Sequence, residues 1–90
     1  MFVARRKSPL AVRVGKRIRA ARERRDWSQR QLAVALDVAE KQVSGYENGW
    51  HMPGLARLER IAELLGVSAE ALMFGSPELG DDEDEDDQAE

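Results

Sequence analysis

Apolar residues recur along this chain with the 3.6-residue spacing of amphipathic helices, in five separate stretches. The first stripe consists of Leu10, Val14, Ile18 and Ala21. Arginines and Lys16 fill the other faces of this helix, to about residue 25. No stretch alternates apolar and polar residues as a half-buried strand would. The pattern therefore predicts an all-α fold that begins with a long amphipathic helix.

The second helix has the clearest start signal in the chain. Ser28 can act as its N-cap, and Gln31, three residues later, completes a capping box. Trp27 can pack on Leu32 as a hydrophobic staple. The helix should end at Asp37, because aspartate tolerates the left-handed conformation of a sharp turn. We therefore expect a short helix followed at once by a tight turn.

Three further helices follow that turn. The third starts near residues 39–40 and ends at Asn48-Gly49, where glycine accepts a positive φ. Residues 50–54 form a loop, and a fourth, amphipathic helix then runs to Gly66. Ser68 is the expected cap of a short fifth helix, which a Gly-Ser-Pro sequence at 75–77 ends.

Composition limits the kind of protein that this chain can be. Its 90 residues allow one hydrophobic core. It has no cysteine, which excludes disulfides, thiolate zinc sites and a cysteine nucleophile. One histidine supports neither a catalytic set nor a metal site, so we expect no enzyme, metal or cofactor. No apolar run is long enough for a membrane helix or a signal peptide, which predicts a soluble cytoplasmic protein.

The formal charge of −3 averages two very different parts of the chain. Residues 81–90 contain eight acids, whereas residues 1–77 contain all 14 bases and eight acids, a charge of +6. Eleven of the bases lie within residues 5–30. This clustering is typical of a polyanion binder, although a solvated arginine-rich helix would produce it too.

The same patterns divide the chain into three parts. We expect a basic arm at 1–9, a folded domain at 10–76 and a disordered acidic tail at 77–90. The tail has two interpretations. It can act as a solubilising appendage, or it can compete with phosphate for the basic surface of the domain.

Several residues recur in the order and spacing of one known family. They are Arg22, Trp27-Ser28-Gln29, Gln31-Leu32-Ala33, Leu36-Asp37-Val38, Val43-Ser44, Tyr46-Glu47-Asn48-Gly49, Pro53, Ile61-Ala62 and Leu65-Gly66-Val67-Ser68. Through them, residues 14–74 resemble the Cro and phage-repressor (XRE-type) helix-turn-helix family. The resemblance implies a five-helix, lambda-repressor-like DNA-binding domain. It also implies a transcription regulator, most often a repressor, that binds a palindromic double-stranded DNA operator as a homodimer.

The resemblance also assigns roles to individual residues. The third helix, about residues 40–48, would lie in the major groove. Its base-reading candidates are Glu40, Lys41, Gln42, Ser44 and Gly45. Candidates for contact with the DNA backbone are Gln29, Arg30, Lys16, Trp50 and His51, although Trp50 can equally pack over the edge of the core. Arg22 and Glu47 would form a structural salt bridge.

The fifth helix supplies the expected dimer surface, formed by Leu72, Met73 and Phe74, because so short a helix cannot turn all three inward. Alternatively, all three complete the core of the monomer. A different function also remains open, that of an antitoxin- or coactivator-like module that uses this fold to bind another protein.

Three residues depart from the family pattern. Asp37 replaces the frequent glycine of the turn, which predicts modest strain. Ala39 stands where serine or threonine usually caps the third helix. Gly45 lies in the middle of that helix and removes a side chain from a position that often contacts DNA.

Overall fold

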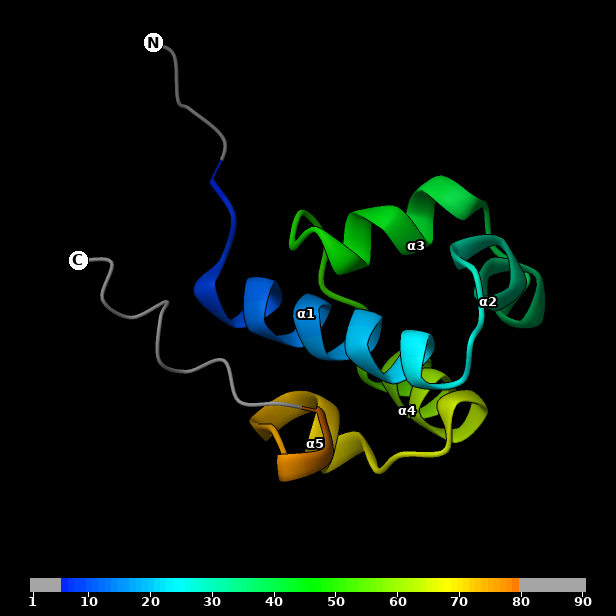
Figure 1. Cartoon of the computed structure of the whole chain (residues 1–90). Helices are drawn as coiled ribbons and strands as arrows, with labels where there is room; N and C mark the ends of the chain where they lie inside the picture. Colours follow the sequence, from blue (N-terminus) through cyan, green and yellow to red (C-terminus); the bar gives the residue numbers. More distant parts are fainter. Residues whose placement is uncertain (1–5, 80–90) are drawn as a thin grey trace, which may run out of the picture.

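The computed structural model describes residues 6–79, which form five α-helices and one 3-10 turn, with no strand among them (Figure 1). The elements are α1 (Pro9–Arg24), α2 (Gln29–Leu36), α3 (Glu40–Glu47), α4 (Leu55–Leu65), α5 (Ala69–Phe74) and η1 (Pro77–Leu79). The predicted all-α, five-helix fold is therefore confirmed. The expectations for residues 1–5 and 80–90, which include the acidic segment, lie outside the described residues.

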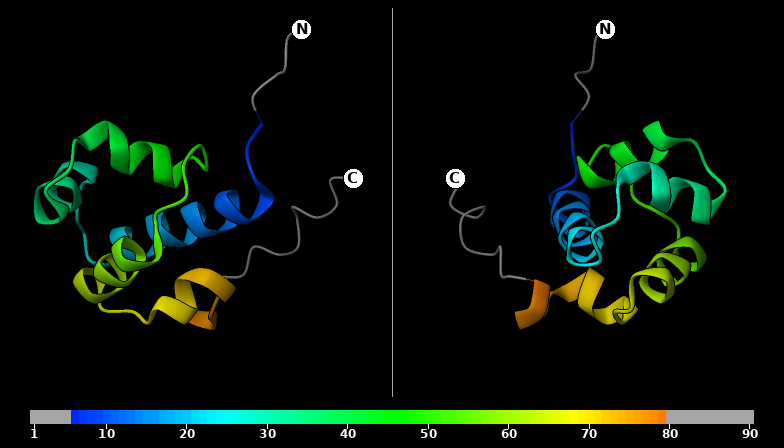
Figure 2. Two further views of the ribbon diagram at one scale, coloured as in Figure 1. Left: turned by 180° about the vertical axis from the view of Figure 1, so that it is seen from behind. Right: turned by 45° about the vertical axis from the view of Figure 1, so that its right-hand side comes forward.

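Helix α1 runs through the middle of the molecule, with α3 on one side and α5 on the other (Figures 1 and 2). Helix α2 packs on α3, and α4 lies between α5 and the pair formed by α2 and α3. The first turns of α1 lie on the same side of the molecule as α5. The surface of α3 is therefore separated from that of α5 by the thickness of α1.

Local capping explains where the helices begin and end. The Oγ of Ser28 accepts a hydrogen bond from the Gln31 backbone N–H at 3.0 Å, and Gln31 Oε1 accepts one from the Ser28 N–H at 2.7 Å. This is the predicted capping box. Asp37 has a φ of 63°, the left-handed conformation expected at the turn. Ala39 is the N-cap residue of α3 and makes no side-chain hydrogen bond to it, as predicted for an alanine at this position.

All five helices contribute to one hydrophobic core. Its most completely buried side chains are Val14, Ile18, Leu32, Val43, Leu58, Ile61 and Leu72. Helices α2 and α3 have only eight residues each, whereas an isolated helix needs roughly 12–15 to be stable in water. The shape of the α2–turn–α3 unit therefore depends on its packing against α1 and α4.

The two ends of the folded region differ from the prediction. Leu10, expected in the buried stripe, is 39% exposed, and Ala11 is instead the first core residue of α1. Periodicity identifies the buried face of a helix but does not show where along it the packing partners begin. Leu79 is only 7% exposed and belongs to the core, so the folded region extends past residue 76 and a tail starting at residue 77 requires correction.

Candidate nucleic-acid interface

Helix α3 has one face toward the core and one toward solvent. Val43, Tyr46 and Glu47 are buried. Successive residues of an α-helix are rotated by about 100° around its axis. Lys41 and Gly45, four residues apart, therefore both lie on the face opposite these buried residues. Glu40 and Lys41 are exposed, and Gln42, Ser44 and Gly45 are half-buried. All five residues predicted to read bases thus lie on α3, and none of them is fully buried.

Two of these side chains have contacts within the protein. The Nε2 of Gln42 donates a hydrogen bond to the Tyr46 hydroxyl at 3.0 Å, and Arg57 of α4 donates to the same hydroxyl at 3.1 Å. Ser44 Oγ accepts a hydrogen bond from Asn48 Nδ2 at 3.2 Å. These contacts hold the side chains of Gln42 and Ser44 along α3.

A charged network beneath the outer surface joins α1, α2 and α3. Arg22 donates from Nε to Glu47 Oε2 at 2.6 Å and from Nη2 to Oε1 at 3.0 Å, and its Nη1 donates to the Trp27 carbonyl at 2.7 Å. The amide of Gln29 also donates to Glu47 Oε1, at 3.0 Å. The hydrogen bonds that Arg22 donates to Glu47 raise the pKa of Arg22, and this effect is larger than the lowering by burial. The pair suggested by the family resemblance is therefore present as a buried ion pair.

The expected backbone-contacting residues lie on three different elements. Gln29 is half-buried at the first residue of α2, beside the exposed Arg30, and Lys16 is exposed on α1. Trp50 is 43% exposed in the loop after α3, and Lys7 Nζ lies 4.6 Å from the centre of its ring, within range of a cation–π interaction. The tryptophan therefore remains accessible at the surface.

The loop after α3 folds back onto that helix. The backbone N–H groups of Trp50 and His51 both donate to the Gly45 carbonyl, at 3.0 and 3.3 Å. The imidazole of the exposed His51 lies directly beside the Cα of Gly45. A loop residue is thereby brought onto the surface of α3.

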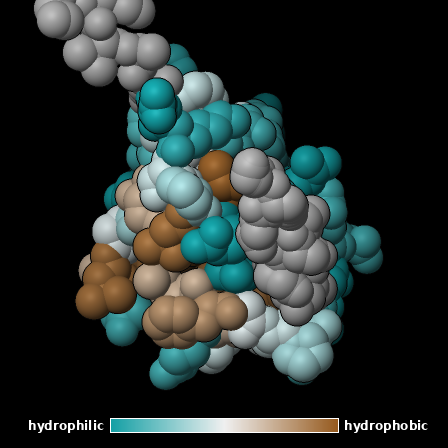
Figure 3. Space-filling view, turned by 90° about the vertical axis from the view of Figure 1, so that its left-hand side faces the viewer, coloured by the Kyte–Doolittle hydropathy of each residue, from teal (hydrophilic) through white to brown (hydrophobic). Residues whose placement is uncertain are grey.

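The three residues predicted to form a dimer surface have different environments. Leu72 is fully buried in the core, so its assignment to the dimer surface requires correction. Met73 is half-buried, and Phe74 is 74% exposed. Apolar surface gathers on the lower half of the side of the molecule where α5 lies (Figure 3). Of these three residues, Met73 and Phe74 are therefore the two with surface left for contact with a partner.

Sequence reasoning placed Arg17 on the outer face of α1, but it is buried. Its Nη1 donates to the carbonyls of Leu72 and Met73 at 3.2 and 2.7 Å. A cation at the C-terminal turn of a helix satisfies carbonyls that have no partner within the helix. The sequence contains a signal for this burial. Position 17 is three residues after Val14 and four before Ala21, so it lies on the apolar face of α1. Arg17 thus anchors α5 to α1.

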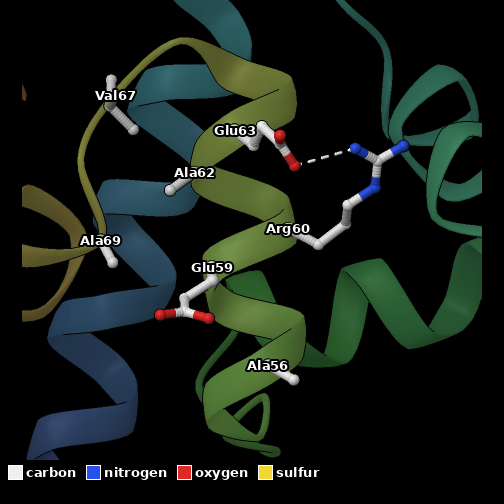
Figure 4. A pocket seen from close by; sticks show the side chains of 7 residues that line it. All are labelled: Ala56, Glu59, Arg60, Ala62, Glu63, Val67 and Ala69. Carbon is white, nitrogen blue, oxygen red and sulfur yellow. Dashed lines mark hydrogen bonds and ion pairs between the residues drawn. The ribbon is translucent and has the colours of Figure 1, made fainter.

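Away from α3, the described residues 6–79 contain a shallow surface hollow, but no cluster of metal-binding side chains. A shallow hollow over α4 and the start of α5 is lined by Ala56, Glu59, Arg60, Ala62, Glu63, Val67 and Ala69 (Figure 4). Arg60 and Glu63 pair with each other there at 3.0 Å, and the lining has no hydroxyl or imidazole nucleophile. Within residues 6–79, no three His, Cys, Asp or Glu side chains gather to bind a metal ion. No helix in that range is long and apolar enough to cross a membrane.

Comparison with known proteins agrees with this arrangement of helices. The model of the family described as helix-turn-helix matches residues 18–72, more than half of the chain. The chain belongs to the helix-turn-helix family. The matched residues include the capped α2, the turn at Asp37 and all of α3. The described part of the chain is therefore a helix-turn-helix domain of the XRE type, as the resemblance indicated.

Helix-turn-helix relatives include DNA-binding regulators. An uncharacterized HTH-type transcriptional regulator of Sinorhizobium medicae is 31% identical over 70 residues, covering 78% of this chain and 50% of the relative. The chain thus spans about half the length of the curated relatives it matches. The biofilm regulator SinR, solved in complex with DNA, is similar with a TM-score of 0.61 and 30% identity, covering 66% of this chain and 95% of that one.

A further solved helix-turn-helix structure is the P22 c2 repressor protein in complex with a synthetic operator. It is similar with a TM-score of 0.66 and 27% identity, covering 70% of this chain and 96% of that one. Together with the family match, these similarities support DNA binding and transcription regulation as the general role of this domain.

Proposed function

We propose that this chain is a sequence-specific transcription regulator, and specifically a repressor, that reads the major groove of double-stranded DNA with α3. The main supporting observation is the outward face of α3. It presents Lys41 and Gly45 opposite the buried Val43, Tyr46 and Glu47. A helix held by one face leaves the other free to enter the groove, which is wide enough for an α-helix.

The side chains at the start of α3 have the chemistry for base recognition. Lysine donates to guanine O6 and N7, and a carboxylate such as Glu40 accepts from cytosine N4. Glutamine pairs with adenine through one N–H and its carbonyl oxygen. The amide nitrogen of Gln42 has two hydrogens, so its bond to Tyr46 leaves one for a base. Ser44, one turn later, can donate or accept.

Contacts to phosphate would set the position of α3 in the groove. Gln29 lies at the N-terminus of α2, where free backbone N–H groups and the helix dipole favour an anion. One amide hydrogen of Gln29 bonds Glu47, and the second is available to a phosphate oxygen. Arg30, Lys16 and Trp50 would add phosphate contacts on either side. These contacts supply affinity and register rather than sequence preference.

The regulator would act as a homodimer on a palindromic operator. One such domain reads only a half-site, and paired domains of this kind bind half-sites about 34 Å apart. Met73 and the exposed Phe74 on α5 are the proposed contact surface, because α5 lies across α1 from α3 and leaves α3 free. We expect it to act in the cytoplasm, without a cofactor and without catalytic activity.

Selection of bound sequences from random duplex DNA tests this proposal. A regulator should select a palindrome, and its affinity for that site should fall steeply with salt, because each phosphate contact releases a counterion. It should also bind that site at least about 1,000-fold more tightly than random sequence. Weak binding without sequence preference would instead indicate a protein-interaction module of the antitoxin or coactivator type.

A further inference from the structure

The His51 side chain occupies the space into which a side chain of residue 45 would project from α3. A Cβ atom placed on Gly45 would lie 2.6 Å from His51 Cδ2, 3.4 Å from Nε2 and 3.6 Å from Cγ. The first distance is too short for a real contact, so the ring fits beside α3 only because residue 45 is glycine. The backbone hydrogen bonds from Trp50 and His51 to the Gly45 carbonyl hold the loop in this place.

The position of this contact on α3 is the important point. Gly45 follows Lys41 by four residues and lies on the same outward face, opposite the residues that pack into the core. His51 is exposed, so its imidazole is available to a ligand at that face. The outward face of α3 therefore contains a side chain that does not belong to α3.

We propose that His51 is a specificity-determining residue that reads one base pair in place of residue 45. This inference rests on the proposed insertion of α3 into the major groove. An imidazole N–H can donate a hydrogen bond to N7 of a purine or to O6 of guanine, the acceptors exposed in that groove. The preferred base at the contacted position is therefore a purine, and guanine offers two acceptors.

Gly45 is required by this arrangement for a reason other than helix stability. Alanine stabilises a helix interior relative to glycine. The atoms that a Cβ at residue 45 would meet belong to a histidine ring at the surface, which can swing away without moving the backbone. Gly45→Ala should therefore keep or raise the melting temperature while it displaces the imidazole from the face of α3.

The experiment compares His51→Ala, Gly45→Ala and the loop control Met52→Ala with the unchanged protein. Each protein is used to select sequences from random duplex DNA, and its melting temperature is measured. His51→Ala and Gly45→Ala should both lose the preference at the same single base pair of each half-site. Discrimination there should fall about 10- to 100-fold while other positions keep theirs. Met52→Ala, which changes an exposed residue of the same loop, should retain the full preference.

Two results would overturn the inference while leaving the proposed function intact. Uniform weakening on all sequences by His51→Ala would make the histidine a phosphate contact. Unchanged base preferences with a lower melting temperature would make it only a packing residue of the loop. If the unchanged protein selects no sequence, the proposed function fails and this inference fails with it.

Discussion

Arg22 and Glu47 form a two-point ion pair that ties the C-terminal half of α1 to the last residue of α3, with N–O distances of 2.6 and 3.0 Å. Their side chains are only 10% and 2% exposed. Because Gln29 bonds the same carboxylate, three helices meet at one buried charge. The geometry of the surface that we propose to contact DNA therefore depends on an interaction beneath it.

Removing one partner of this pair should destabilise the whole domain. Glu47→Ala leaves the guanidinium of Arg22 buried without its counter-charge, which should lower the free energy of unfolding by about 3–5 kcal/mol. Urea denaturation measures this change. The control is Glu23→Ala, which breaks the solvent-exposed pair with Arg19 and should cost less than about 1 kcal/mol. Equal losses in the two variants would show that the buried pair has no special role.

The missing cap of α3 offers a stabilising substitution. Ala39 has the extended backbone conformation of an N-cap, with a φ of −73° and a ψ of 151°, but no side-chain oxygen. Ala39→Ser should raise the free energy of unfolding by about 1 kcal/mol, because the hydroxyl can accept a backbone N–H of the first turn. Ser28→Ala, which removes an existing cap, should lower it by a similar amount. Thermal melting of both variants checks whether their changes in stability have opposite signs. A loss of stability in Ala39→Ser would contradict the expected N-cap geometry at residue 39.

Lys41 and Gln29 should affect DNA binding in different ways. Lys41→Ala should cost about 1–3 kcal/mol on the selected operator and relax the preference at one base pair, because it removes a base contact. Gln29→Ala should weaken binding to the operator and to random DNA alike, because phosphate contacts carry no sequence information. Titrations against both duplexes separate the two effects. A loss of affinity for one sequence only in the Gln29 variant would make Gln29 a base-reading residue.

Phe74 and Leu72 should separate assembly from folding. Phe74→Asp places a charge on an exposed side chain and should yield a folded monomer, whereas Leu72→Ala should cost about 2–5 kcal/mol of stability, because it opens a cavity in the core. Analytical ultracentrifugation and circular dichroism report the two properties. A protein that sediments as a monomer, both free and on an operator-length duplex, would rule out the dimer.

Removing residues 81–90 should increase binding to random-sequence DNA at low salt. These residues carry eight acids beside a domain of opposite charge, so they form a tethered competitor for the basic surface. The effect should fade as salt shortens the screening length, which is about 10 Å at 0.1 M. Truncation must spare Leu79, because that residue is part of the core. Equal affinities of the two forms at low salt would leave these residues with a solubilising role only.

The sequence by itself determined the helices, their order and the family. Capping boxes, left-handed turn residues and helix-ending glycines act within four or five residues, so Ser28, Asp37 and Gly66 can be interpreted without the rest of the fold. The outward position of Lys41 also follows from helical periodicity once Val43 and Tyr46 are taken as core residues.

Only the tertiary structure decided which side chains meet across the chain. Arg17 bonds the carbonyl of Leu72, 55 residues away, and that contact cannot be inferred from the spacing of apolar residues in α1. The same is true of Leu72, which faces the core while Phe74 faces solvent, because a six-residue helix has too little periodicity to fix its rotation. The placement of His51 beside Gly45 depends on how the loop folds back onto α3. Packing in three dimensions selects such contacts, and local sequence rules do not describe it.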